Sequence, residues 1–507
     1  MTTVIFYGKM NENKAFGGTH MKFGLKLLAL ILAMIFCFSV LVACDGSGSS
    51  EETTAADNGG DQETSGEQDT EVTPDMPSVE QKNYDDVFYL FLESSGAPMD
   101  YYWVEESQND VLSAALYNRQ QLVLNHLGVE IYAWHNASSD YTEEFKTAVK
   151  TKSGAIDMMT THVSIGVSGL VSDGYLYQFN EMPGIDLDAD YWNRKFMDSL
   201  AISDMYFLGF SDFNILRTHV IAFNKTLLEK YDDALDKSLY EMVDDYEWTI
   251  DEMINLAKVA FINNGSTDKN QYGMTGLQWV PWCGFLEGCG INLVEMNDEG
   301  GYSVSFYNDK NKDKTINLVG KLKDFSDAEY TCFDYFSFDI TVPFTSNRAL
   351  MTLSSTEQLT TYLNYDVDFG IVPYPLYDTN QTEYHSLQWG GYLALPAYME
   401  DEQMIGETIE MLSYFSSGVN TAFYEKLLGK QVADNPDDRR MLEIVWDSVC
   451  TDFGQTFEGA SEDMLYMLPY VTYSNSGYEL TAYYDGHAGS ANRSLINFVK
   501  KVEKKNK

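Results

Sequence analysis

Two tryptophans, Trp279 and Trp282, stand in the segment LQWVPWCGF, directly after an apolar run that predicts a β-strand. Indole rings at a strand end can stack on the apolar faces of sugar rings, with polar neighbours holding the hydroxyls. The alternative is packing in the core, because tryptophan is highly buried on average. We expect at least one of the two rings to contact a ligand. Trp389, which precedes Gly390 and Gly391, is a similar candidate.

Hydroxyl and imidazole side chains follow two other predicted strands. Thr161 and His162 end the run IDMMTTH, and Ser355 ends the run ALMTLSS. Such groups can hydrogen-bond a ligand, although His162 can equally be a loop histidine with its partners in the protein. Tyr473 comes from a C-terminal segment that we expect to return to the same place. The candidate ligand-binding residues are therefore Trp279, Trp282, Trp389, Gly390, Thr161, His162, Ser355 and Tyr473.

Motifs for catalysis and metal binding are scarce. The sequence contains no P-loop, no His-Glu-x-x-His and no Gly-x-Ser-x-Gly motif. The acidic runs DLDAD and DKNKDK lack the glycine and the glutamate that a calcium loop requires. The seven histidines include no close pair for a transition metal. We therefore predict no enzyme, no cofactor and no metal site, with a carboxylate pair for glycoside hydrolysis as an open alternative.

Net charge excludes whole classes of function. The 507 residues include 33 Lys and Arg against 77 Asp and Glu, which gives a formal charge of −44. Nucleic-acid binding and attachment to an anionic membrane surface both need clustered basic side chains. The sequence therefore predicts no nucleic-acid partner. Its length corresponds to about three domain-sized units, and 44% hydrophobic residues supply material for a sizeable core.

Residues 1–43 are predicted to be a signal peptide. From residue 21 the chain reads MKFGLKLLALILAMIFCFSVLVAC, in which Lys22 and Lys26 precede an apolar stretch that ends at Ala43. A transmembrane anchor is the alternative, but an acidic segment follows the apolar stretch instead of a basic cluster. Residues 1–20 do not look like part of a signal, and our hypothesis is that Met1 is a mis-assigned start.

The apolar stretch ends abruptly at Cys44. The sequence Leu-Val-Ala-Cys at 41–44 resembles the lipobox of bacterial lipoproteins, in which the peptidase cuts before a cysteine that carries the lipid. The resemblance implies lipidation at Cys44 and labelling by palmitate. The residues after Cys44 are polar and acidic and cannot repay the entropy of ordering. Residues 44–85 are therefore predicted to be a lipidated cysteine and a disordered acidic tether.

From residue 86 onward, short apolar runs alternate with helical patterns. DVFYLFLE, VEIYAW and IDMMTT predict three strands, and residues 109–126 and 142–152 predict the helices between them. This β-α-β-α-β order predicts a largely parallel sheet with helices on both faces. Ligands of such sheets lie at the carboxyl ends of the strands.

Four cysteines follow the tether, at Cys283, Cys289, Cys332 and Cys450. The segment CGFLEGC brings two of them into one short loop, which a disulfide can close in an exported protein. Buried free thiols are the alternative. The sequence alone leaves the choice open.

Several motifs recur in one order along the chain. They are VIAFNKTLLEKY (220–231), YEWTIDEMINLAKVA (246–260), YGMTGLQW (272–279), FTSNRALMTLSST (344–356), DFGIVPYPLYD (368–378) and WGGYLALPAYMEDEQMIGETIEMLSYFSS (389–417). Their order resembles the bacterial extracellular solute-binding protein family 1, the binding components of ABC importers. The resemblance covers nearly all of residues 86–507. It departs from the usual pattern at Trp248-Thr249, which is transposed, and at Asn347-Arg348, where Gly-Lys is common.

The resemblance implies an α/β, two-lobed, periplasmic-binding-protein-like fold (type II), with discontinuous lobes joined by a hinge. Residues 86–218 and 388–435 are expected to form lobe 1, residues 219–387 lobe 2, and residues 436–507 C-terminal helices that cross both lobes. The crossings are expected near 217–222 and 386–392. Independently of the resemblance, Thr249 is placed to cap a helix, and the prolines of GIVPYPLY must end a strand or keep it at a sheet edge.

The function implied is the capture of a small solute, with a sugar or oligosaccharide favoured, by closure of the lobes. Delivery to an ABC permease follows from the same resemblance. We expect a monomer, anchored in the cell membrane through its N-terminal lipid and facing the extracellular side or the periplasm. Two alternatives stay open: a cell-surface enzyme acting on glycans, and a surface sensor or adhesin that retains the binding fold.

Overall fold

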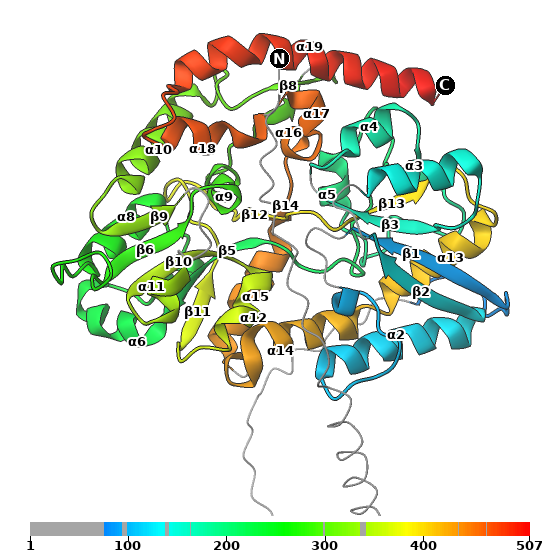
Figure 1. Cartoon of the computed structure of the whole chain (residues 1–507), viewed down its shortest axis with the longest axis horizontal. Helices are drawn as coiled ribbons and strands as arrows, with labels where there is room; N and C mark the ends of the chain where they lie inside the picture. Colours follow the sequence, from blue (N-terminus) through cyan, green and yellow to red (C-terminus); the bar gives the residue numbers. More distant parts are fainter. Residues whose placement is uncertain are drawn as a thin grey trace, which may run out of the picture. The chain divides into compact units, whose positions relative to one another are not determined.

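The computed structural model describes residues 76–93, 99–136, 141–162, 164–297, 300–334, 341–433, 435–462 and 464–506 (Figure 1). The predicted lipidation site Cys44, the predicted signal peptide and the first part of the predicted tether lie outside these ranges. Within them, no helix has both the length and the apolar character that a membrane span requires. The described residues contain two five-stranded sheets.

The first sheet has the strand order β2-β1-β3-β13-β4. Its strands are β1 (Asp86–Leu92), β2 (Val129–His135), β3 (Met158–Thr161), β4 (Leu176–Tyr177) and β13 (Tyr392–Pro396). Helices α2 (Val111–Leu127) and α3 (Thr142–Thr151) connect the first three strands. β1 runs parallel to both β2 and β3, so the predicted β-α-β-α-β order is confirmed. The late strand β13 joins this sheet antiparallel to β3.

The second sheet has the strand order β11-β5-β10-β6-β9. Its strands are β5 (His219–Asn224), β6 (Tyr272–Leu277), β9 (Thr331–Asp334), β10 (Ala349–Ser355) and β11 (Phe369–Val372). β11 is an edge strand and ends directly before Pro373, as the proline pattern predicts. Thr249 caps helix α8 (Ile250–Val259) by accepting a hydrogen bond from the backbone N–H of Glu252, which confirms the predicted cap.

Crossing segments connect the two sheets. The chain enters β5 after Thr218, and it enters β13 after β12 (Ser386–Leu387), which pairs in parallel with β14 (Val449–Cys450). An isolated bridge joins Thr218 to Gln388, so two of the crossing segments touch. Helix α14 (Ser417–Ala433) contacts α2 beside the first sheet and α12 (Thr356–Tyr362) beside the second. We call the elements around the first sheet lobe 1 and those around the second sheet lobe 2.

The last helices are α15 (Pro436–Asp447), α16 (Phe453–Thr456), α17 (Glu458–Ser461), α18 (Met467–Thr472) and α19 (Leu480–Lys505). α18 contacts α9 (Val280–Gly288) and α10 (Lys312–Ser326) of lobe 2. α19, drawn in red, passes over both lobes in Figure 1 and contacts β8 (Tyr302–Val304) and α4 (Val167–Ser172).

The remaining elements complete the two lobes. In lobe 1 they are α5 (Arg194–Ser199), α13 (Glu402–Tyr414) and the 3-10 turns Met99–Tyr101 and Phe179–Glu181. In lobe 2 they are α6 (Lys225–Leu228), the 3-10 turn Glu229–Ala234, α7 (Leu239–Asp244), β7 (Val294–Met296) and α11 (Val342–Thr345); the turn Met464–Tyr466 precedes α18. Most buried apolar side chains of both lobes form one continuous core within the described residues, and Cys283, Leu387 and Leu465 form a second, small cluster.

Cys283 and Cys289 are free and buried, so the disulfide alternative is wrong in this structure. Helix α9 separates them by six positions, which turns the two side chains to different sides of the helix. The Cys283 thiol contacts the carbonyl of Leu465 at 3.4 Å, whereas the Cys289 thiol contacts the carbonyl of Pro375 at 3.9 Å.

Candidate functional site

Strand ends from the two sheets meet where the chain crosses between the lobes. β1 leads into Glu93 and β3 into His162, both in lobe 1. β5 begins at His219 and runs antiparallel to β10, so His219 lies opposite Ser355, the last residue of β10. Trp389 follows the crossing strand β12. The candidate site is built around these ends.

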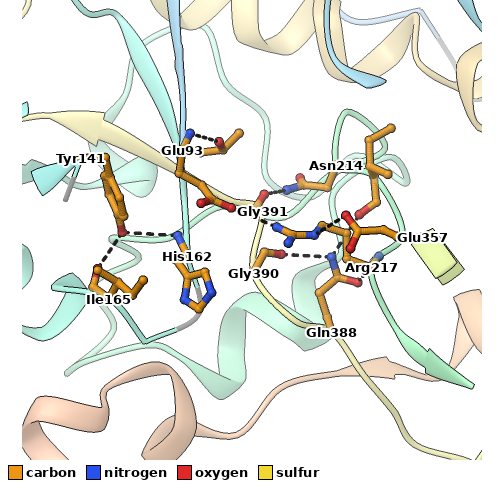
Figure 2. Close-up of polar contacts among 12 residues, drawn as sticks. Glu93, Tyr141, His162, Ile165, Asn214, Arg217, Glu357, Gln388, Gly390 and Gly391 are labelled. Carbon is orange, nitrogen blue, oxygen red and sulfur yellow. Dashed lines mark hydrogen bonds and ion pairs between the residues drawn. The ribbon is translucent and has the colours of Figure 1, made fainter. Parts of the chain in front are cut away.

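Arg217 is the charged centre of the site and connects residues of both lobes. Its Nη1 lies 3.1 Å from Oε1 of Glu93, and its Nε lies 3.0 Å from Oε1 of Glu357 in α12 (Figure 2). The side chains of Arg217 and Glu93 are 4% and 0% exposed. Burial opposes the guanidinium charge, but the carboxylates of Glu357 and Glu93 outweigh it and raise the pKa of Arg217. Burial raises the pKa of Glu357, and Arg217 opposes this rise.

Hydrogen bonds between the side-chain amide of Gln388 and the backbone fix Arg217 relative to the second crossing segment. The Arg217 N–H donates to Oε1 of Gln388 at 3.0 Å, and Nε2 of Gln388 donates to the carbonyls of Ile215 and Gly390 at 3.0 and 3.1 Å (Figure 2). The Gln388 amide therefore ties both crossing segments together. Because this amide is fully buried, its loss would leave several backbone groups without partners.

The Gly390-Gly391 pair makes the sharp turn that brings Trp389 beside lobe 1. Both glycines have left-handed backbones, with φ of 85° and 75°, which other residues adopt at a cost. The Gly391 N–H donates to the carbonyl of Thr161 at 2.8 Å. A Cβ on Gly391 would stand 2.9 Å from the hydroxyl of Tyr102, so space as well as φ requires glycine here.

Two neutral imidazoles flank Trp389. The ring centroid of Trp389 lies 6.2 Å from that of His162 and 5.9 Å from that of His219. Burial, together with a smaller contribution from the nearby charge of Arg217, lowers the pKa of both histidines to about 4. Both rings are therefore uncharged at neutral pH. Trp389 itself is only half-buried.

Several polar atoms around this turn are buried and make no hydrogen bond of standard geometry with the described protein. They are the hydroxyls of Tyr102, Thr161 and Thr218 and both ring nitrogens of His219. Buried polar groups are hydrogen-bonded in the great majority of cases, so a set of this size at one place calls for an explanation. Its chemistry suits a ligand that offers several hydroxyls. No group of three or more His, Cys, Asp or Glu within the described ranges is arranged to hold a metal ion.

The structure brings five of the predicted site residues together: Trp389, Gly390, Thr161, His162 and Ser355. Trp279 lies on the lobe 2 side, where its ring stacks on Tyr466 with centroids 4.2 Å apart. Tyr466 and Trp389 pack against the same small apolar cluster. Trp279 is thus linked to Trp389 through Tyr466 and this cluster.

Trp282 and Tyr473 are placed differently. Trp282 is fully buried, donates from Nε1 to Oγ1 of Thr472 at 2.9 Å, and packs edge-on against Phe285 and Phe333. This corresponds to the core-packing alternative. Tyr473 follows α18 and is half-buried.

Sequence reasoning missed the charged part of the site. Arg217, His219 and Glu357 are not among the candidates, and Glu93 is singled out from the sequence only as the end of a strand. Glu93 carried one usable signal, since it is an acidic residue at the end of an otherwise apolar strand. Arg217 carried another, as a lone cation in a crossing segment.

Comparison with known families decides what kind of protein carries this fold. A family model described as bacterial extracellular solute-binding protein matches residues 120–429. The chain belongs to this family. The resemblance read from the sequence motifs is therefore confirmed at the level of the family. Membership implies an extracellular or periplasmic location for this solute-binding protein. A comparison with curated proteins finds no match.

Solved structures agree on the fold. The solute-binding protein is similar to the GacH receptor of Streptomyces glaucescens GLA.O, solved unliganded and with acarbose, at 17% identity, covering 82% of this chain and 98% of that chain with a TM-score of 0.51. It is also similar to a solute-binding protein from Thermotoga Lettingae TMO bound with α-D-tagatose, at 12% identity, 81% and 100% coverage and a TM-score of 0.51.

A third similar structure is a solute-binding protein from Agrobacterium radiobacter K84 in complex with ribitol, at 14% identity, 80% and 98% coverage and a TM-score of 0.51. At such identities the likeness shows the fold alone. The two-lobed type II fold expected from the sequence is thereby confirmed.

Proposed function

We propose that this solute-binding protein captures a neutral sugar or oligosaccharide between its lobes and delivers it to the permease of an ABC importer. One observation carries the proposal: buried hydroxyl and imidazole groups gather around Trp389 at the crossing between the two lobes, and several of them make no hydrogen bond of standard geometry with the described protein. An aromatic face combined with hydroxyl and imidazole groups matches the alternating apolar and polar surfaces of a sugar ring. The similar structures solved with acarbose, tagatose and ribitol support the same class of ligand.

The charge of the site favours a neutral solute over an acidic one. Arg217 faces two carboxylates, those of Glu93 and Glu357, so this group carries a net negative charge when all three are ionised. The neighbouring histidines add no positive charge at neutral pH, because their pKa values are about 4. A carboxylate on the solute would meet repulsion at low dielectric. A hydroxyl would meet acceptors and donors instead.

Capture is proposed to follow from movement of the lobes. Arg217 contacts residues of both lobes, and Trp389 stands in a crossing segment. A solute held there touches both lobes at once and therefore stabilises the state in which they are close. Its affinity is then the difference between its interactions with the closed and open states.

Thermal unfolding in the presence of sugars tests the proposed function. A sugar present at about 100 times its Kd should stabilise the protein by about 2.7 kcal/mol. Glucose and galactose, with maltose and longer oligosaccharides, should be compared with the matching acids glucuronate and galacturonate. We expect stabilisation by at least one neutral sugar and none by the acids. Stabilisation only by acids, amino acids or peptides would contradict the proposal, and mass spectrometry of co-purified ligand provides the independent check.

Attachment to the membrane is proposed to depend on Cys44. The support is the lipobox-like sequence that precedes it and the acidic tether that follows. Cys44→Ala should abolish incorporation of labelled palmitate and release the protein from the membrane fraction into the medium or periplasm. Cys37→Ala, within the apolar stretch, is the matched control and should leave labelling unchanged. Persistent labelling of the Cys44 variant would refute the proposed site.

A further inference from the structure

Helix α19 is fixed to lobe 2 along its first half. The hydroxyls of Thr481 and Tyr307 lie 2.7 Å apart, and the backbone N–H of Val304 in β8 donates to Oδ1 of Asn492 at 2.8 Å. The ring of Tyr484 contacts those of Phe306 and Tyr307. These contacts combine backbone, hydroxyl and aromatic groups, so this half of α19 belongs with lobe 2.

The second half of α19 buries Leu495, Phe498 and Val502, contacts α4, and reaches lobe 1 with several polar side chains as well. Nζ of Lys501 lies 2.5 Å from Oδ1 of Asp173 and 3.2 Å from Oγ of Ser172, at the end of α4. Oγ of Ser203 donates to Oε1 of Glu503 at 2.7 Å. In Figure 1 the red helix passes over the top of both lobes and ends on the side of α4. One helix thus touches both lobes.

Helix α17 reaches α4 from the same C-terminal segment. A Cβ on Gly459 would stand 3.4 Å from Cβ of Ser168 in α4, so the two helices are in van der Waals contact at this point. Oγ of Ser168 is buried there and makes no hydrogen bond with the described protein. Nearby, the hydroxyl of Tyr302 in β8 donates to the carbonyl of Ala201 in lobe 1 at 2.5 Å.

The two bridges between the lobes differ in kind. On one side α14 packs along α2 and α12 and continues the chain from one lobe toward the other. On the other side, side chains of α17, α19 and β8 contact α4 and the segments beside it. The continuous chain through α14 can bend while the lobes move. The side-chain contacts on α4 must separate if the lobes move apart.

We propose that α17 and α19 form a latch on α4 that holds the two lobes together, and that solute enters and leaves only when this latch releases. The proposal rests on capture of solute by lobe movement, as proposed above. The latch combines buried apolar side chains, such as Leu495 and Val502, with an ion pair that adds little to its strength. The Lys501–Asp173 pair is half-exposed at both ends, and pairs of this kind contribute little and are screened by salt.

An engineered disulfide tests the latch directly. Disulfides need Cβ atoms about 3.5–4.5 Å apart, which the Ser168 and Gly459 positions nearly meet at 3.4 Å. We expect Ser168→Cys combined with Gly459→Cys to crosslink α4 to α17 under oxidising conditions. The oxidised protein should release bound sugar at least tenfold more slowly than the same protein after reduction. Each single variant, treated identically, should exchange sugar at the wild-type rate.

Small-angle X-ray scattering on the sugar-free double variant gives a readout that does not depend on any ligand. Reduction should raise the radius of gyration, because only the uncrosslinked lobes can separate. Equal radii in both redox states, or equal release rates, would overturn the latch and leave the proposed function standing. Absence of any sugar effect on wild type would instead overturn the proposed function, and the scattering would still test the latch.

A single substitution tests the latch even if the crosslinked protein does not fold correctly. Lys501→Met removes the contact with Asp173 and should speed sugar release severalfold at low salt, with the difference shrinking at high salt. Lys500→Met is the matched control, since Lys500 is exposed on the same helix and forms no ion pair with a described residue. Equal release rates for the two variants at low salt would contradict the latch.

Discussion

Replacing Arg217 by Met should destabilise the protein by about 3–5 kcal/mol, the cost of leaving a buried charge without its partner. Arg217 is the shared counterion of Glu93 and Glu357, and Glu93 is fully buried. Methionine fills similar volume but supplies no charge, so the two carboxylates would face each other at low dielectric. Urea denaturation at pH 7, followed by tryptophan fluorescence, measures the loss.

The variant should also acquire a characteristic pH dependence. Without Arg217, burial and mutual repulsion raise the carboxyl pKa values in the folded protein above those of the unfolded chain. The folded state then binds more protons than the unfolded state, so stability increases as pH falls. Arg217→Met should therefore regain part of its lost stability between pH 8 and pH 5. The stability of the wild type should also increase as pH falls, but less steeply, because Arg217 limits the rise in the pKa of Glu357.

Neutralising the carboxylates is the control that separates charge from packing. The triple variant with Arg217→Met, Glu93→Gln and Glu357→Gln removes all three charges and should recover much of the stability. It should also lose the pH dependence of the single variant. If Arg217→Met loses less than about 1 kcal/mol, or if its loss does not change with pH, the ion-pair network is not what holds the lobe junction together.

The sequence predicts the fold well where local patterns and family motifs coincide. Residues 86–161 form three strands and two helices because the strands are apolar or alternating runs and α2 has its own start and stop signals. Asp110 caps α2 at one end and Gly128 ends it at the other. Thr249 and Pro373 act in the same local way in lobe 2. Such signals involve neighbours in sequence, so one sequence suffices to read them.

The site is harder to predict because its residues meet only through tertiary structure. Glu93 and Arg217 are 124 positions apart, and Arg217 and Gln388 are 171 apart. The local sequence around Glu93, Arg217 or Gln388 does not indicate that these residues will be in contact. The glycine pair at 390–391 could be singled out, since its conformational freedom is intrinsic. The residues that contact this glycine pair could not be predicted from the sequence.

Aromatic residues illustrate the same limit within one segment. Trp279 and Trp282 have nearly the same surroundings in sequence, yet one is half-buried and stacks on Tyr466 while the other is fully buried beside Phe285. The start of α9 decides the difference, because Trp279 lies just before the helix and Trp282 lies within its first turn. A shift of the helix start by a residue or two would change which ring is exposed, and sequence patterns do not fix helix ends that closely.

Replacing Trp389 by Ala should weaken sugar binding about 10- to 100-fold, which corresponds to about 1.4–2.8 kcal/mol. The half-buried indole between His162 and His219 offers an apolar face at the crossing between the lobes. Stacking of a sugar face on this ring combines burial of apolar area with the preferred geometry of aromatic contacts. Isothermal titration with the sugar found by thermal screening measures the change in Kd.

Trp103→Ala is the matched control, because Trp103 lies on lobe 1 away from the crossing and donates from Nε1 to the carbonyl of Ile131 in β2. It should leave the Kd unchanged even if it lowers stability. Trp389→Phe should retain part of the affinity, since it keeps a smaller aromatic face. An unchanged Kd in Trp389→Ala would show that the solute does not contact this ring. The unpartnered hydroxyls and imidazole around it would then have to be satisfied by water rather than by a sugar.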